Sequence, residues 1–435
     1  TLLIGMLMVM PAILQPAFLK DIIKVSPDFF GLTNGFLQNM SQIATLAFVG
    51  MIGVLSDKTG RKILAVLGFG LLIVFYYLFG QSHAIAEYLN ISQGFSSKVC
   101  AVLSFAPSRA EEFTTFSPGL FMAYLLRLFV GLSMVLCYPQ FITMVADYTY
   151  EKDRGKGMAF NGIMMGLASI IIFSAIAPIG RKSGVQGLFT VAALMAFIGM
   201  TCTWAFLKER LPETKKEDKK GLREVARVVM QSPALKSSYL CSLISRADIT
   251  VMATFIISWA VQAGDKFQLT SEAATQKGSI PMIIMSIITF ISFPFIGVML
   301  DKWGRLPTII LTLISGGIGL ILVSITPSPF SGLTYFAVVL VGIGIAGSIA
   351  GANTLATDVS PKALVGSILG GLNTMQPIGM IFFLQLGGYL FDVLGPGWAF
   401  GLKGGANLLL VIWLLLQKKG IDNELTQRRD TQAKA

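Results

Sequence analysis

The segment G-V-L-S-D-K-T-G-R-K (residues 53–62) lies between two long apolar runs, and a close copy, G-V-M-L-D-K-W-G-R-L, returns at residues 297–306. The second copy also lies between two apolar runs. A short charged turn at corresponding places in two hydrophobic halves is typical of a membrane protein that arose by internal duplication. The sequence therefore predicts two similar halves, each with one copy of the turn.

The composition indicates that lipid, and not water, surrounds most of the protein surface. Of its 435 residues, 54% are hydrophobic and 13% are charged, whereas soluble proteins carry about 25% charged residues. A helix needs about 20 apolar residues to cross a bilayer, and the chain contains about twelve such runs. They are 1–19, 31–54, 63–81, 119–145, 157–178, 187–207, 238–262, 278–300, 307–326, 333–357, 364–392 and 398–417. The first run is barely long enough, and we expect the beginning of its helix to be missing.

These runs predict an all-α membrane protein with twelve transmembrane helices in two pseudo-symmetric six-helix bundles. A second internal repeat supports this division, because Asp147 precedes Gly155 by the same spacing with which Asp358 precedes Gly366. The predicted parts are a first bundle at 1–207 with a long extracytoplasmic loop at 82–118, a basic cytoplasmic linker at 208–237, a second bundle at 238–417 and a cytoplasmic tail at 418–435.

The net charge of +11 is distributed unevenly along the chain. Most Lys and Arg residues fall in loops on one side of the predicted spans, which is the bias of cytoplasmic loops. We therefore expect the motif loops and both termini to be cytoplasmic in a plasma (inner) membrane. Anionic lipid headgroups, and not nucleic acid, are the expected partners of this charge. In the linker, Leu222, Val225 and Val229 have helical spacing among basic residues, which predicts an amphipathic helix on the inner membrane surface.

The sequence contains neither a phosphate-binding P-loop nor a His/Cys metal motif. It also lacks a nucleophile–base arrangement near a span. We therefore expect no enzymatic activity, no cofactor and no metal.

Three ionisable residues that we place inside spans are functional candidates: Arg127, Arg246 and Asp248. A charge in the membrane costs at least about 2.5–3.5 kcal/mol on insertion scales, so it needs a reason. Asp248 follows Arg246 by two residues, so the two side chains should point to different faces. Together the three could hold an anionic substrate and relay a proton. The alternatives are a structural ion pair between bundles, or an Arg246 that reaches toward the membrane surface.

The charged motif between spans two and three, its weaker copy between spans eight and nine, the arginine of span four and the charged central loop resemble the major facilitator superfamily of secondary transporters. The resemblance covers essentially the whole chain. It implies that the motif acts as a conformational latch that holds in the outward-open state and is strained when the cytoplasmic side opens. The latch residues and their partners are Gly53, Asp57, Gly60, Arg61, Lys62, Asp147, Asp301, Gly304, Arg305 and Asp358.

The resemblance also implies that spans one, four, seven and ten line the transport cavity. Arg127, four residues before Gly131, resembles the family's span-four motif for proton coupling, and Asp248 is the second candidate for that role. The candidate substrate-binding residues are Gln15, Arg127, Gln140, Ser245, Arg246, Asp248, Asn353 and, from span eleven, Gln376.

These patterns predict a secondary active transporter that moves a small organic solute by alternating access with proton coupling. Two solute classes stay open. The paired arginines favour an organic-anion symporter, whereas spans rich in Met and Phe are compatible with a multidrug–proton antiporter. A third reading is a transporter-like sensor that moves nothing, but a scaffold gains nothing from an arginine at the membrane midplane. The expected partners are a small-molecule substrate, a proton and membrane lipids.

Overall fold

The computed structural model describes residues 1–148, 154–209, 222–361 and 364–433, without the side chains of residues 57, 146–147, 154–159, 176–178, 180–182, 222–223 and 429–433. No strand occurs in these ranges. The long helices are α1 (Leu2–Phe18), α2 (Phe30–Thr59), α3 (Arg61–Gly80), α6 (Ser117–Tyr148), α7 (Arg154–Phe206), α9 (Pro233–Ile244), α10 (Asp248–Ala263), α11 (Ser271–Lys302), α12 (Arg305–Ile325), α13 (Gly332–Val359), α14 (Val365–Val393) and α15 (Gly397–Leu416). The shorter elements are η1 (Leu19–Ile23), η2 (Pro27–Phe29), α4 (Ser82–Tyr88), α5 (Gln93–Leu103), η3 (Pro107–Phe113), α8 (Leu222–Gln231), η5 (Ser245–Ala247), η6 (Gly264–Phe267) and α16 (Lys418–Ala433).

The described helices account for the predicted membrane spans. Eleven are long and apolar enough to cross a bilayer, and the shorter apolar stretch Phe160–Ala175 supplies the remaining predicted span. The predicted spans five and six are the two legs of α7, which turns at Gly184 with φ 68° and ψ 172°. The predicted span seven is α9, η5 and α10 together. The prediction of an all-α, twelve-helix membrane protein is confirmed.

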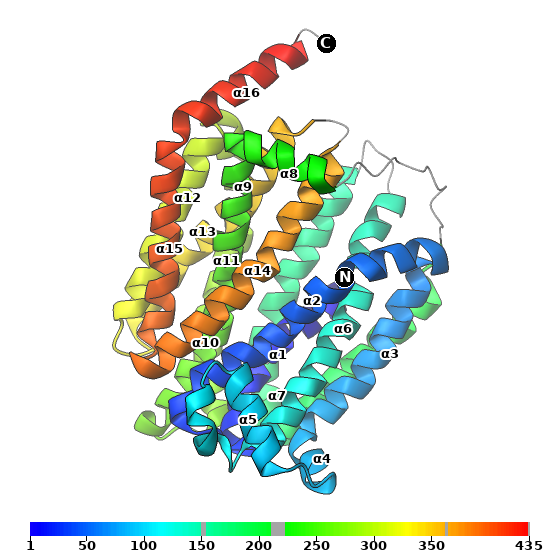
Figure 1. Cartoon of the computed structure of the whole chain (residues 1–435), viewed down its shortest axis with the longest axis vertical. Helices are drawn as coiled ribbons and strands as arrows, with labels where there is room; N and C mark the ends of the chain where they lie inside the picture. The colour runs from blue at the N-terminus through cyan, green and yellow to red at the C-terminus, as the bar shows by residue number, and fades with distance from the viewer. Residues whose placement is uncertain (149–153, 210–221, 362–363, 434–435) are drawn as a thin grey trace.

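Helices α1 to α7 form the first bundle and α9 to α15 the second (Figure 1). In the first, α3 packs on α6 and α7, and α1 packs on α7; in the second, α12 packs on α13 and α15. Both copies of the repeated motif turn the chain at their second glycine, Gly60 with φ 96° and Gly304 with φ 97°. Side chains strongly disfavour this backbone region, so glycine is required at both turns. We call the end of the molecule that carries these turns the motif face and the opposite end the far face.

The linker and the tail both contain a helix at the motif face (Figure 1). Helix α8 forms as the sequence predicted, but the prediction that its apolar side lies on the membrane is wrong. Val225 and Val229 are buried in a cluster that includes Leu235 of α9 and Ile421 of α16. These two valines pack on protein because the ends of α9, α14 and α16 already offer them an apolar surface. The Glu424 carboxylate of α16 also accepts hydrogen bonds from the Ser232 hydroxyl and the Ala234 N–H, at 2.9 and 3.2 Å.

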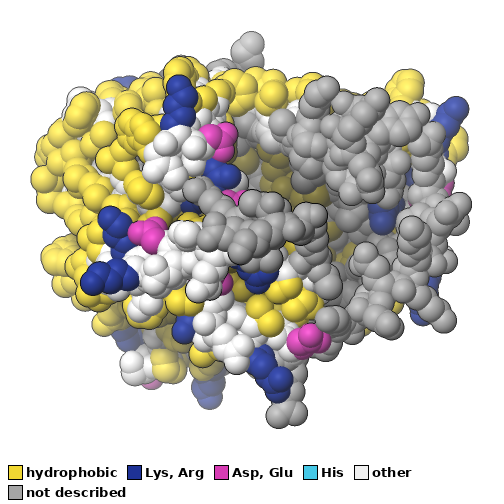
Figure 2. All heavy atoms as spheres, turned by 90° about the horizontal axis from the view of Figure 1, so that it is seen from above, with side chains coloured by type: hydrophobic (Ala, Val, Ile, Leu, Met, Phe, Trp, Pro, Cys, Tyr) yellow, Lys and Arg dark blue, Asp and Glu magenta, His cyan; other side chains and the backbone are white. Residues whose placement is uncertain are grey.

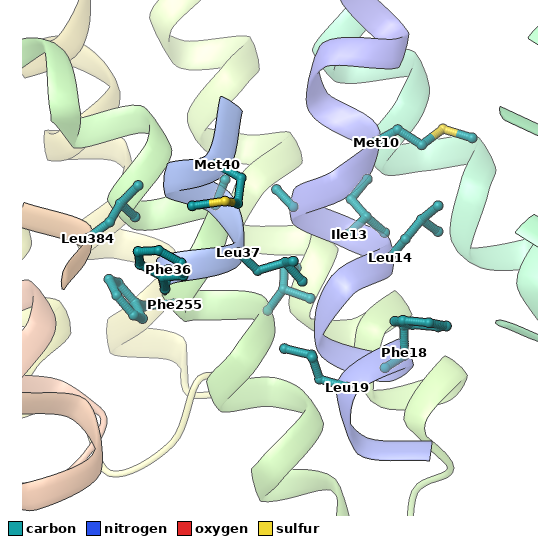
Figure 3. Packing of buried hydrophobic residues seen from close by; sticks show 14 of the residues in the cluster. Met10, Ile13, Leu14, Phe18, Leu19, Phe36, Leu37, Met40, Phe255 and Leu384 are labelled. Atoms are coloured by element: carbon teal, nitrogen blue, oxygen red, sulfur yellow. The ribbon is translucent and has the colours of Figure 1, made fainter. Parts of the chain in front are cut away.

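The two bundles are joined by polar contacts at the far face. Lys20, after α1, pairs with Asp265 of η6 at 2.7 Å. The Asp392 carboxylate of α14 accepts the backbone N–H groups of Gly31 and Leu32 in α2, at 2.6 and 2.8 Å. Apolar side chains fill the interface nearby, where Phe36, Leu37 and Met40 of α2 lie close to Phe255 and Leu384 of the second bundle (Figure 3). The far face is therefore closed in this conformation.

Helices α2 and α14 are antiparallel and separate toward the motif face. At the far end their backbones nearly touch, because a Cβ on Gly31 would lie 2.8 Å from the Gly388 oxygen. Continuing the same register places Gly53 near Gly366. Within the described part of the chain, a Cβ on either of these two glycines would meet no atom within 4 Å. Figure 2 shows the motif face hollowed near its centre, with hydrophobic side chains inside the hollow. The conformation is closed at the far face and open at the motif face.

Candidate functional site

The seventh span is broken where its charged residues lie. Helix α9 ends at Ile244, a short 3-10 segment covers Ser245–Ala247, and α10 begins at Asp248. Irregular backbone at membrane depth is tolerated only where protein or a water-filled cavity surrounds it. The start of α10 also carries the positive end of a helix dipole, which favours a negative group such as the Asp248 carboxylate. The break therefore makes this segment the centre of the candidate site.

The Arg246 guanidinium points from the break toward α13 and α14. Its Nη1 donates to Asn373 Oδ1 at 2.9 Å and to Gln376 Oε1 at 3.2 Å, and its Nη2 donates to Asn353 Oδ1 at 2.5 Å. All three acceptors are neutral amides, and among the described residues no carboxylate forms an ion pair with Arg246. The guanidinium thus keeps an uncompensated positive charge.

This cluster offers hydrogen-bond donors. An amide whose oxygen accepts from Arg246 still has an NH₂ group with two donors, and the guanidinium has no acceptor at all. Asn353 and Asn373 lie about 9 and 12 Å from the motif-face ends of their helices, by the helical rise, and Asn373 is exposed. A group of donors around a free positive charge, reached from the open face, suits an anion.

The Asp248 carboxylate points away from Arg246, as its spacing predicted, and meets Lys403 of α15. The two form an ion pair in which both side chains are buried. Asn407, one turn after Lys403, bridges them: its Nδ2 donates to Asp248 Oδ2 and its Oδ1 accepts from Lys403 Nζ, both at 2.9 Å. The alternative of an ion pair between the bundles is therefore wrong for Asp248, because both of its partners belong to the second bundle.

Lys403, Asn373 and Asn407 are absent from the residues predicted from the sequence. Lys403 lies inside the predicted span 398–417, yet it is missing from the ionisable residues that we place inside spans. A single cation in an apolar run was the available signal. Asn373 precedes Gln376 by three residues, which puts both on one helix face, and that spacing could have identified it.

The other predicted substrate residues do not join the Arg246 cluster. Arg127 is buried, its Nη2 donates to Gln38 Oε1 at 3.3 Å, and among the described residues it has no acidic partner. Gln15 is buried, and neither amide atom has a hydrogen-bond partner among the described residues. Gln140 is also buried. The Ser245 hydroxyl donates to the Cys241 carbonyl of α9, at 2.6 Å.

The charged residues of the second motif copy bind one another. Arg305 Nη1 contacts Asp301 Oδ1 at 2.7 Å and Arg305 Nε contacts Asp358 Oδ2 at 2.8 Å, which joins the ends of α11, α12 and α13. The structure thus brings these three predicted residues together. The resemblance implies that such contacts are strained when the motif side opens, and their role as a latch stays a prediction. All three helices belong to the second bundle, so we expect the contacts to persist when the bundles separate at the motif face.

In the first copy, the side chains of Asp57 and Asp147 lie outside the described part of the structure. The residue that caps α3 is Glu209, which follows α7. Its carboxylate accepts the backbone N–H groups of Arg61 and Lys62 at 3.0 and 2.9 Å. An acid at a helix N-terminus is favoured by the dipole, so Glu209 fixes the end of α7 to the motif turn.

The sequence profile of the Major Facilitator Superfamily matches residues 1–275 and 238–434. The chain belongs to this superfamily. It is 24% identical over 402 residues to the magnetosome protein MamH of Paramagnetospirillum magneticum, with 92% of this chain and 87% of MamH covered. It is 26% identical over 421 residues to the magnetosome protein MamZ of the same organism, and there it spans 60% of the longer relative. The structure superposes on the nucleoside transporter NupG with a TM-score of 0.71 at 12% identity, covering 96% of this chain and 98% of NupG.

Proposed function

We propose that this member of the Major Facilitator Superfamily is a proton-coupled symporter for a small organic anion, which works by alternating access. The observation that carries the proposal is Arg246, held at a helix break by three neutral amides with no carboxylate beside it among the described residues. An uncompensated guanidinium in the membrane is costly unless a ligand supplies the missing negative charge. A carboxylate or another anionic group fulfils that need.

The way in which the bundles meet supports alternating access. In the conformation described, the far face is closed by Lys20–Asp265 and by the Asp392 contacts, whereas the motif face is hollowed. The anion site then opens to the motif face. Rocking of the bundles about the site would close that face and open the other, as in transporters built from repeats. In this cycle the Arg305 contacts keep the ends of α11, α12 and α13 together, so these three helices move as one unit.

The direct test is counterflow in proteoliposomes that hold the purified protein, with radiolabelled small carboxylates, cations and neutral solutes compared. Arg246→Gln removes the charge, and Arg246→Lys keeps it without the fork geometry. Charge-assisted hydrogen bonds contribute about 1.5–3 kcal/mol each, so we expect the KM for the anion to rise about 10- to 100-fold in Arg246→Gln. Arg227 of α8 is exposed, and Arg227→Gln is the matched control that should transport normally.

The same experiment separates the alternatives. Export of hydrophobic cations driven by a proton gradient, without counterflow of any anion, would identify a multidrug antiporter and refute the proposal. Binding without flux of any solute would favour a sensor. The predicted roles of Arg127 and Gln15 are tested with Arg127→Gln and Gln15→Leu in the same assay.

We further propose that the motif face is cytoplasmic, with anionic lipid headgroups around its basic residues, and that the protein lies in the inner membrane. The charge bias of the loops supports this orientation. MamH is named a magnetosome protein, so a magnetosome membrane is the other location to examine with a fluorescent tag. Labelling of single cysteines at Lys58 and Arg227 from outside intact cells would contradict the orientation.

A further inference from the structure

The Asp248–Lys403 pair is inaccessible to solvent in the conformation described. Asp248, Lys403 and Asn407 are all buried, and the pair lies in the second bundle between α10 and α15. Replacing such a pair by apolar residues is often neutral or stabilising, because both charges lose their hydration when they are buried. Stability alone therefore does not explain why the charges are there.

The position of the pair suggests a use. Asp248 is the first residue of α10, directly after the break, and Arg246 with its amide cluster is two residues before it. A change of charge at Asp248 therefore acts on a ligand at Arg246 over a short distance along the chain. The two groups are also fixed to one another by the same three-residue segment, so they move together.

Lys403 has other partners that would let it stay charged if Asp248 became neutral. Its Nζ donates to Asn407 Oδ1 at 2.9 Å and lies 4.7 Å from the centre of the Phe383 ring of α14. An ammonium over an aromatic face is stabilised by the ring quadrupole. Among the described residues, the charged group that faces Asp248 is Lys403. Phe383 of α14 and Gly316 of α12 pack nearby and carry no charge; Gly316 lies near Asn407.

We propose that Lys403 is the positioning residue of the proton site, and that its ammonium takes the place of the proton on Asp248 when the proton leaves toward the motif face. The inference rests on the proposed anion symport and assigns its coupling device. The structure corresponds to the state after release, in which Asp248 is ionised and paired. In the state open to the far face, Asp248 carries the proton and Lys403 is held by Asn407 and Phe383.

The charge balance explains symport. With a protonated Asp248 and a charged Lys403 the pair carries one positive charge, which adds to that of Arg246 and favours the anion. When the O–H bond of the acid breaks, the proton leaves to water on the motif-face side before Lys403 pairs with the carboxylate, and the buried pair that then forms is neutral. The anion loses one attractive charge at that moment and is released to the same side. A unit charge about 10 Å away at an effective dielectric constant of about 20 changes affinity on the order of tenfold.

The experiment compares the wild type with Asp248→Asn, Lys403→Gln, the double variant Asp248→Asn/Lys403→Gln, and Lys403→Arg. In proteoliposomes, anion counterflow reports binding and exchange, and accumulation driven by a pH gradient reports coupling. In the double variant we expect counterflow to persist, accumulation to be lost so that the inside and outside concentrations become equal, and anion affinity to lose its roughly tenfold increase at acidic pH. Lys403→Arg should keep accumulation.

A purely structural pair gives the opposite result, because a neutral amide pair would replace it without harm. Wild-type accumulation and an unchanged pH profile in the double variant would overturn the inference. If that variant does not fold, Asp248→Glu and Lys403→Arg decide: each should shift the pH midpoint of accumulation, and an unchanged midpoint in both would overturn it. The two failures are distinguishable. Absence of anion counterflow in the wild type refutes the proposed function. Anion counterflow in the wild type, together with wild-type accumulation in the double variant, refutes only this inference.

Discussion

Asp392 provides a quantitative test of how the far face is kept closed. It lies at the end of α14 in the second bundle, and its two carboxylate oxygens accept the N–H groups of Gly31 and Leu32 at 2.6 and 2.8 Å. These residues begin α2 in the first bundle, where the helix dipole adds a favourable interaction with a negative charge. Opening of the far face must break both bonds.

The free energy by which Asp392 stabilises the closed state follows from the number of its hydrogen bonds. Hydrogen bonds to a charged group contribute about 1.5–3 kcal/mol each, and neutral ones about 0.5–1.5 kcal/mol. Asp392→Asn keeps one acceptor oxygen and removes the charge, so we expect a loss of about 2 kcal/mol from the closed state. Such a change shifts the population ratio toward the far-open state about thirtyfold.

The assay is a distance measurement by double electron–electron resonance between nitroxides at Lys24→Cys and Lys277→Cys, both exposed at the far face. Cys202 is the exposed native cysteine among four, so Cys202→Ser gives the background. Asp392→Asn should add a population with a longer distance. Asp422→Asn on α16 is the control, because that exposed acid is at the motif face. Identical distance distributions for both variants would refute the reasoning.

Three further variants test other parts of the mechanism. Gly53→Leu should have a normal melting temperature, because in the described structure a Cβ there meets no atom within 4 Å. It should nevertheless abolish counterflow, because the larger side chain blocks closure of α2 on Gly366; normal counterflow would contradict this. Gln15→Leu should raise thermal stability by about 1–3 kcal/mol, since it removes buried amide atoms without partners, and should slow transport; a lower melting temperature would contradict it. Arg305→Gln should lower the free energy of unfolding by less than about 1 kcal/mol. It should also leave the nitroxide distances unchanged, because the partners of Arg305 lie in its own bundle; a longer distance would show that the contacts act between bundles.

The fold could be predicted because its main constraints are local. Apolar runs of membrane length, the duplicated turn and the charge bias each depend on neighbouring residues, and together they gave the span pattern. The glycines at 60 and 304 belong to the motif because only glycine adopts the backbone of both turns. The opposite directions of Arg246 and Asp248 also followed from their spacing alone.

The site could be predicted only in part, because partners come from distant segments. Asn353 and Gln376 were candidates and do contact Arg246, but the pairing of Asp248 with Lys403 depends on how α15 packs on α10. The surface on which α8 lies likewise depends on the ends of other helices. A hydrophobic stripe predicts that something covers it, and not whether lipid or protein does so.

The two ends of the interface between the bundles differ in a way that bears on energy coupling. The far end combines an ion pair with the hydrogen bonds that the Asp392 carboxylate accepts, whereas Gly53 and Gly366 at the motif end face open space in the described structure. Closing the motif end gains apolar contact but breaks the polar contacts of the far end. A ligand shifts such an equilibrium only by its differential affinity for the two states. If the anion at Arg246 and the proton at Asp248 both bind the far-open state more tightly, neither alone needs to supply the whole difference. The asymmetry of the interface is then what makes transport depend on both.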